Sequence, residues 1–283
     1  MNNFKTWLLM GSLTILLVLI GKLILGQSGA ILFFIIAVGL NLFSYYFSDK
    51  IALSMTRSKP LAEHEAPEIY DMIRHLSQQA GLPMPRVYRI PSLQPNAFAT
   101  GRNSTHAVVA VTDGLRQILN RQEIEGVIAH ELAHIKNRDI LIGSIAAIIA
   151  GAITMIANVL QWGLIFGGGG GDDDDGGGIL GLIGMLLMII LAPLAATLIQ
   201  LAISRAREFQ ADATGSRIAG QSDGLANALL KLERAAHQVP MEVNPATSHM
   251  FIINPLSGGS LVRLFSTHPL ISERVQKLRQ MKQ

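Results

Sequence analysis

The chain has 283 residues, of which 49% are hydrophobic and 15% are charged, and its formal net charge is +3. This composition is too apolar for an ordinary soluble protein and predicts a membrane protein. The chain has no cysteine, which excludes disulfides, zinc–thiolate sites and cysteine nucleophiles. Any zinc must therefore be held by histidine and carboxylate side chains.

Four apolar stretches are long enough to cross a bilayer, which takes about 20 apolar residues. They are Trp7–Leu25, Ala30–Phe47, Ile140–Phe166 and Ile179–Ile203. We interpret residues 1–47 as an N-terminal transmembrane hairpin, because the first run is long for a cleaved signal peptide and no clear cleavage site follows it. Residues 140–203 are read as a second, inserted hairpin. Buried core helices are the alternative for this pair, but the length and nearly charge-free interiors argue against it.

Basic residues indicate the orientation. Of 23 Lys and Arg, 11 fall in residues 48–139 and 10 in residues 204–283, whereas the connectors Gly26–Gly29 and Gly167–Gly178 have none. The positive-inside rule then places both large segments and both termini in the cytoplasm. A membrane protein with several spans is expected. The pI near 9.3 fits a basic face near anionic lipid, and no aromatic-interleaved basic stripe suggests nucleic-acid binding.

The connector Gly167–Gly178 is a Gly/Asp-rich, low-complexity loop. Its four aspartates could bind a divalent cation, but the flanking glycines give them no fixed geometry, so a flexible solvated loop is favoured.

Residues 48–139 and 204–283 together suit one cytoplasmic domain that the second hairpin splits. Helical patterns cover residues 66–80, 122–137, 202–218, 223–237 and 271–281, and a short helix begins at Leu115. Arg86–Ile90 and His106–Val111 are β-prone runs. The expected fold is an α-helical membrane protein with about four transmembrane helices and a mainly α (α+β) domain that carries a small β-sheet.

The motif that carries chemistry is His130-Glu131-Leu132-Ala133-His134. On a helix, residues four apart share a face, so both imidazoles can reach one metal ion. Zinc favours such ligands, and a catalytic site leaves one position for water. Glu131 beside that water can act as a general base. A bare H-E-x-x-H also arises by chance on surface helices, so its surroundings decide.

A third ligand is available at Glu208, which shares a helix face with Asp212 four residues later. Glu208 would complete a two-histidine, one-glutamate site, and Asp212 would accept the N–H of a ligating histidine. Acidic residues that merely balance Arg205 and Arg207 are the alternative reading. His134 precedes the third span and Glu208 follows the fourth, so an antiparallel hairpin would bring the two halves together.

With these residues in view, the sequence resembles the M48 family of zinc metallopeptidases, and most closely the HtpX-type membrane proteases of bacteria. The resemblance covers most of the chain through four motifs: N-A-F-A-T-G at Asn96–Gly101, H-E-L-A-H at 130–134, R-x-x-E-F-x-A-D at Arg205–Asp212 and S-T-H-P at Ser266–Pro269. It implies a zincin-like domain, zinc-dependent proteolysis of membrane proteins in quality control, and Glu208 as third ligand. It also implies a location in the bacterial cytoplasmic (inner) membrane.

The resemblance also implies that Asn96, Ala97 and Phe98 lie by the cleft, where an edge strand pairs with extended substrate. An ordinary loop is the alternative there. His268 is open between a fourth ligand, a donor to the oxyanion and a structural histidine, and the resemblance favours the donor. Asp139 is either an outer partner of a ligand or a helix cap.

The expected function is that of a zinc-dependent, membrane-bound endopeptidase, with one Zn²⁺ per subunit, that acts on the cytosolic parts of misfolded or damaged membrane proteins. Unfolded polypeptides and the lipid bilayer are its expected partners. Two alternatives remain: a CAAX-type prenyl-peptide protease, which shares the motifs, and a non-enzymatic scaffold that keeps zinc for structure. The intact Glu131 speaks against the second, because a structural site needs no base.

Overall fold

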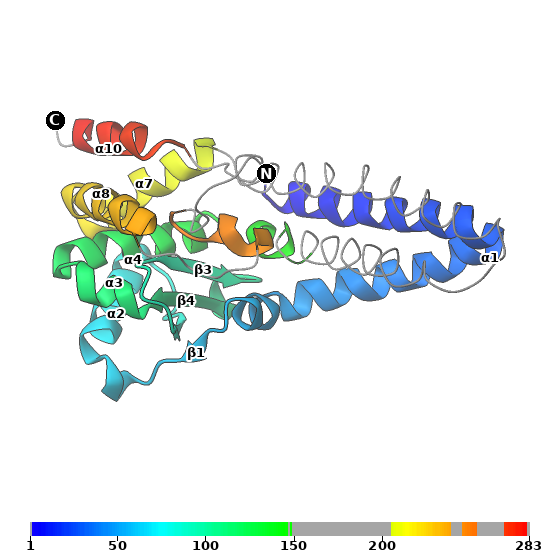
Figure 1. The fold of residues 1–283 in the computed structure, drawn as a ribbon, viewed down its shortest axis with the longest axis horizontal. Helices are drawn as coiled ribbons and strands as arrows, with labels where there is room; N and C mark the ends of the chain where they lie inside the picture. The colour runs from blue at the N-terminus through cyan, green and yellow to red at the C-terminus, as the bar shows by residue number, and fades with distance from the viewer. Residues whose placement is uncertain (1, 147, 149–204, 239–244, 254–268, 282–283) are drawn as a thin grey trace, which may run out of the picture.

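The computed structural model describes residues 2–146, 148, 205–238, 245–253 and 269–281 (Figure 1). The helices are α1 (Asn2–Met55), α2 (Pro67–Ala80), α3 (Asp113–Ile118), α4 (Arg121–Lys136), α7 (Arg205–Ala219), α8 (Asp223–Gln238) and α10 (Ile271–Gln280). The strands are β1 (Lys59–Pro60), β2 (Arg86–Ile90), β3 (Ala97–Gly101) and β4 (Ala107–Thr112). Three short 3₁₀ turns are η1 (Glu63–Glu65), η2 (Ser104–His106) and η3 (Pro245–Met250). The mostly helical fold with a small sheet confirms the predicted mix of elements.

Helix α1 folds back on itself as a long hairpin, and both of its ends lie at the sheet-and-helix body (Figure 1). The reversal is at Gly26, whose φ of 63° and ψ of −145° suit glycine. The two arms are tied by Asn41, whose Nδ2 donates to Met10 O at 3.2 Å and to Thr14 Oγ1 at 2.9 Å. Such polar contacts hold helices together where lipid removes the hydrophobic driving force.

Within the described residues, one helix, Gly26–Met55, is long and apolar enough to cross a membrane, and Met10–Leu19 is a shorter apolar stretch. The predicted second span ends at Phe47, but the helix continues to Met55 and buries Leu53 in the body. The predicted third and fourth spans and the Gly/Asp-rich loop fall almost entirely outside the described residues. Four spans therefore stay a prediction.

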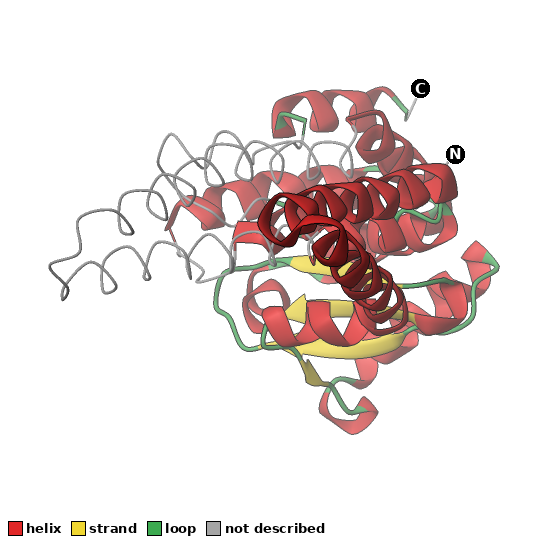
Figure 2. Ribbon diagram, turned by 90° about the vertical axis from the view of Figure 1, so that its right-hand side faces the viewer, coloured by secondary structure: helices red, strands yellow, loops and turns green. Residues whose placement is uncertain are grey.

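The sheet has four strands in the order β1-β2-β4-β3. Strand β2 is parallel to β4, and β3 runs antiparallel to β4 with Ala97 opposite Val111 and Gly101 opposite Ala107. Strand β3 is consequently an edge strand, as the resemblance implied. Figure 2 shows the sheet seen past the α1 hairpin, with helices packed on it.

Both faces of β4 are buried, so this strand reads as a continuous apolar run. On one face, Val109 and Val111 join the main core with residues of α2, α4, α7, α8 and α10. On the other face, Val108 and Ala110 pack with Leu53 and Phe251. The alternation follows from the two-residue period of a strand. Helix α4 packs directly against β3.

Local signals explain the start of the motif helix. The side chain of Asn120 accepts from Glu123 N at 3.0 Å, and the Glu123 carboxylate accepts from Asn120 N at 2.8 Å. This capping box satisfies two backbone donors that a helix start would otherwise leave unpaired. Helix α4 ends at Lys136, and a new helical stretch covers residues 140–146. The motif helix and the described start of the predicted third span are thus separate helical stretches joined at Asp139.

Candidate metal centre

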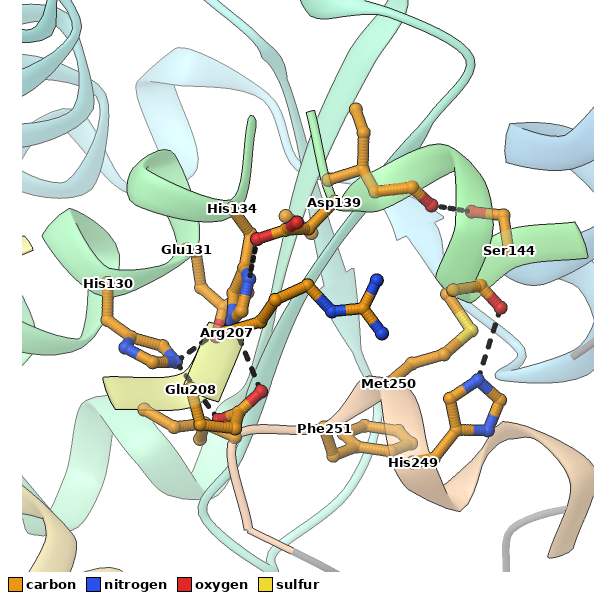
Figure 3. Close-up of a pocket in the computed structure, with 14 residues that line it drawn as sticks. His130, Glu131, His134, Asp139, Ser144, Arg207, Glu208, His249, Met250 and Phe251 are labelled. Atoms are coloured by element: carbon orange, nitrogen blue, oxygen red, sulfur yellow. Dashed lines mark hydrogen bonds and ion pairs between the residues drawn. The ribbon is translucent and has the colours of Figure 1, made fainter. Parts of the chain in front are cut away.

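Helix α4 presents two histidines on one face. His130 and His134 lie one turn apart, and their Nε2 atoms are 3.1 Å from each other (Figure 3). The rings meet edge to face, with centroids 4.7 Å apart. Glu131 follows His130 on the same helix and is buried. The helical spacing therefore produces the predicted pair of convergent imidazoles.

Helix α7 supplies the third donor. Glu208 Oε2 lies 3.8 Å from His130 Nε2, and Glu208 Oε1 lies 3.7 Å from His134 Nε2. One ligand atom from each of the three residues falls within 4.8 Å of the other two. Residues 134 and 208 are far apart in the chain, so packing of α7 against α4 creates this cluster. The predicted gathering of His130, His134 and Glu208 is present.

Two aspartates lie behind the histidines. His130 Nδ1 is 3.0 Å from Asp212 Oδ1, and His134 Nδ1 is 3.2 Å from Asp139 Oδ2. A carboxylate at Nδ1 favours the tautomer that carries its proton there. The Nε2 lone pairs of both rings then point at one spot beside the Glu208 carboxylate. Two imidazole nitrogens and a carboxylate suit Zn²⁺, so the residues fit the metal that the sequence predicts.

Burial and neighbouring charges set the protonation of the cluster before a metal binds. Burial lowers the pKa of His130 to about 4. Burial also acts to lower the pKa of His134, but the hydrogen bond with Asp139 and the charge of Glu208 outweigh it and raise that pKa to about 9. Burial raises the pKa of Glu131 to about 7, although the charge of His134 opposes the shift. A carboxyl group with such a pKa is suited to proton transfer near neutral pH.

Arg274, on α10, is a fully buried arginine that the sequence interpretation missed. Its Nε and Nη2 donate to Asp212 at 2.9 and 2.7 Å, and its Nη1 lies 3.6 Å from Glu208 Oε2. Burial disfavours the charged guanidinium, but the Asp212 carboxylate outweighs it and raises the pKa of Arg274. A signal was available, since Arg274 shares the buried face of α10 with Val275 and Leu278.

A cavity of about 60 Å³ lies beside the cluster. The three donors and Glu131 line one side, and Met250, Phe251 and Ile252 line another. Arg207 and His249 also reach it, and His249 Nε2 lies 3.1 Å from Gly143 O (Figure 3). The sequence interpretation assigned no functional role to His249, Met250, Phe251 or Ile252.

The proposed substrate residues Asn96, Ala97 and Phe98 are fully buried. Phe98 packs on Phe251, with ring centroids 5.3 Å apart. The residue of β3 that lines the cavity is Ala99, the next residue along the chain. Asp139 lies at His134, which favours the partner reading over a simple cap. His268 falls outside the described residues.

Comparison with known proteins identifies the family of the chain. Residues 63–282 match Peptidase family M48. The chain belongs to this family. Three relatives of the M48 peptidase bear the name "Protease HtpX homolog". The one from Pelotomaculum thermopropionicum is 65% identical, covering 99% of each chain. Those from Desulfatibacillum aliphaticivorans and Pyrococcus furiosus are 57% and 56% identical, covering 98% of this chain and 89% and 95% of the relative.

A solved structure has a similar fold. The M48 peptidase matches the crystal structure of S. mikatae Ste24p with a TM-score of 0.53 at 21% identity. The match covers 95% of this chain and 62% of that chain. At this identity the likeness shows the fold alone.

The M48 peptidase is therefore a membrane-bound metalloprotease, as the sequence predicted. The histidine–histidine–glutamate cluster of an H-E-x-x-H peptidase is present in its structure. The alternatives of a prenyl-peptide protease and of a non-enzymatic scaffold are not favoured. The chain is 65% and 57% identical to proteins named HtpX protease homologues over nearly its full length.

Proposed function

We propose that this M48 peptidase is a zinc-dependent endopeptidase that cleaves cytosolic parts of misfolded or damaged membrane proteins. The observation that carries the proposal is the convergence of His130, His134 and Glu208 beside Glu131 in a chain of this family. Unstructured loops and tails suit the site, because an edge strand binds peptide backbone with little sequence preference. Asn96, Ala97 and Phe98 would belong to that substrate-binding edge.

His130, His134 and Glu208 would hold the zinc ion and leave a fourth position open. Zinc bound there supplies Lewis acidity toward the scissile carbonyl and a water molecule. Asp212 and Asp139 would keep the two Nδ1 atoms protonated, so that each Nε2 lone pair faces the ion. The distances of 3.0 and 3.2 Å behind the rings support these roles.

Glu131 would take a proton from the attacking water and pass it to the leaving amine nitrogen. Its carboxylate is buried and lines the same cavity as Ala99 of β3. His268 would act near the site as a donor to the oxyanion, a role that rests on the resemblance.

Residues 48–139 and 204–283 would form one catalytic domain, split by the inserted hairpin of residues 140–203. Contacts of α4 with both α7 and α8 support this organisation. The domain and both termini would face the cytoplasm, with the α1 hairpin and the inserted hairpin in the membrane. The long apolar helix Gly26–Met55 supports the first of these anchors.

The decisive experiment replaces Glu131 by Gln in the full-length, membrane-extracted protein. Glu131→Gln should retain zinc, because the three ligands are intact, and should lose cleavage of an unfolded substrate such as labelled casein. The matched control is Glu125→Gln, a half-exposed glutamate on the same helix, which should cleave normally. Cleavage at the wild-type rate by a zinc-loaded Glu131→Gln protein would contradict the assignment of the base.

The same variant tests the substrate class. Glu131→Gln expressed in membranes should trap uncleaved membrane proteins, which crosslinking and mass spectrometry identify. Recovery of folded soluble proteins alone would contradict a role in membrane-protein quality control.

A further inference from the structure

The outer edge of β3 faces the candidate metal centre. Thr112 N donates to Asn96 O at 3.0 Å, which fixes the hydrogen-bonding phase of β3 on β4. In an antiparallel pair this phase alternates, so the backbone groups of Ala97 and Ala99 point away from β4. Ala99 lines the same cavity as Glu131, which places the outer edge of β3 beside the catalytic base. An extended peptide that reaches the catalytic base would pair with this edge.

A segment of the same chain already lies on that edge. Ile252 N donates to Ala97 O at 3.0 Å. One residue later, Ile253 O accepts from Asn96 Nδ2 at 2.8 Å, and Ile253 N lies 3.4 Å from Asn96 Oδ1. One residue earlier, the ring of Phe251 packs on Phe98. The segment Phe251–Ile253 therefore runs antiparallel to β3.

The side chains of this segment pack on both cores beside β3. Ile252 and Ile253 belong to the main core with Ala97 and Ala99, and Phe251 belongs to the opposite core with Phe98. Phe251 and Ile252 therefore point to opposite faces, whereas the chain bends at these residues and Ile253 packs on the same face as Ile252.

Further contacts hold the backbone of this segment. Arg274 Nη1 donates to Ile252 O at 3.1 Å. The carbonyls of Ile252 and Ile253 and the N–H of Ile252 are therefore all bound by groups next to the metal centre. The bond from Ile252 N to Ala97 O is the main-chain contact that strand addition uses, and the side chains of Asn96 and Arg274 bind the two carbonyls. All three bonds are made to backbone atoms of the segment, so a peptide of any sequence could make them.

The segment also narrows the cleft. The remaining cavity of about 60 Å³ holds a few waters, since one water needs at least about 10–15 Å³ of this space. Met250, Phe251 and Ile252 form its wall. A substrate backbone cannot lie along Ala97 while Ile252 is bound there.

We propose that Phe251–Ile253 is an internal occupant of the substrate-binding edge, and that an extended polypeptide binds by displacing it. The inference rests on the proposed function, since it concerns the substrate of that site. The incoming chain would take the antiparallel direction of the segment. Its backbone would contact Ala97, Asn96 and Arg274 in place of Ile252 and Ile253.

The absence of cysteine from the chain allows a clean crosslinking test. Ala97→Cys with Ile252→Cys places two thiols at opposed positions, where antiparallel Cα atoms lie about 4.5–5.5 Å apart and can be bridged. Oxidation of the purified full-length protein should form the disulfide and reduce cleavage of labelled casein by about tenfold or more, with zinc content unchanged. Reduction with tris(2-carboxyethyl)phosphine, which does not strip zinc as a dithiol does, should restore the rate that the double variant shows before oxidation.

The matched control is Lys59→Cys with Arg89→Cys, an opposed pair in β1 and β2 away from the cleft. Oxidation of this pair should leave cleavage unchanged. Full activity of the oxidised Ala97–Ile252 pair, with the crosslink verified by mass spectrometry, would show that the segment is a fixed wall and would overturn the proposal. Failure of the disulfide to form would overturn the register.

A second variant weakens the segment without a crosslink. Phe251→Ala removes its packing on Phe98 and should lower KM for casein several-fold while kcat changes little. A raised or unchanged KM would contradict displacement. If the proposed function itself were wrong, the result would differ, because neither the wild type nor the reduced cysteine variant would then cleave casein.

Discussion

Gly215 on α7 packs against the backbone of His130 on α4. A Cβ atom placed at Gly215 would lie 2.9 Å from both the Cα and the N of His130, closer than real Cβ contacts come. The absence of a side chain at Gly215 thus sets the separation of the two helices that carry the metal-binding residues.

We predict that Gly215→Ala pushes α7 away from α4 and moves Glu208 out of reach of the two histidines. The variant should lose zinc during dialysis and be destabilised by about 1–3 kcal/mol. Metal analysis and thermal unfolding measure both effects. Gly39→Ala is the control, because a Cβ there meets nothing within 4 Å. Zinc retention by Gly215→Ala would contradict this account of the helix packing.

The two aspartates behind the histidines should respond differently to removal of their charge. Asp139→Asn should weaken zinc binding by about 10–100-fold, through His134 alone. Asp212→Asn should do the same through His130 and also leave Arg274 without its main counter-charge. Because that pair is buried, the added loss of stability should be about 3–5 kcal/mol. Equal unfolding midpoints for the two variants would contradict the special role of Arg274.

Zinc binding should release a proton at neutral pH. The raised pKa of His134, about 9, keeps that ring protonated at pH 7, whereas the lowered pKa of His130, about 4, keeps the other neutral. Zinc must displace the His134 proton, so apparent affinity should rise with pH and level off above about 9. Calorimetry in buffers of different ionisation enthalpy counts the proton. Affinity independent of pH between 7 and 9 would contradict the prediction.

Asn120 caps the motif helix, so its removal should affect stability without touching the chemistry. Asn120→Ala loses the bond to Glu123 N and should lower the free energy of unfolding by about 0.5–2 kcal/mol. The zinc-loaded variant should keep its kcat. Asn103→Ala, which removes a similar cap from the exposed turn η2, is the comparison and should cost less. A larger effect at Asn103 would show that the α4 cap is dispensable.

Local signals in the sequence predicted several elements of the domain and the meeting of the metal donors. Pro67 and Gly81 bound α2, and the β-prone run Arg86–Ile90 is β2 without change of bounds. The meeting of His134 with Glu208 was predicted from helical spacing and from a hairpin between them. These features depend on periodicity and on membrane topology, and both can be inferred from local patterns in the sequence.

Long-range pairing could not be predicted in the same way. Arg274 was missed because one charged residue on an apolar face does not reveal its partner, Asp212, which is far away in the chain. Strand β1 has two residues, too few for a periodic signal. The position of Ile252 beside Ala97 depends on how η3 packs against β3, which no local pattern encodes.

The separation of the metal donors along the chain has a consequence for biosynthesis. His130 and His134 leave the ribosome before Glu208, which follows 74 residues after His134 (208 minus 134). At roughly 5–20 residues per second, translation alone delays the third donor by about 4–15 s. A nascent chain therefore lacks a complete metal site while its first apolar segments are being inserted. The peptidase cannot act on neighbouring nascent proteins before Glu208 has been synthesised.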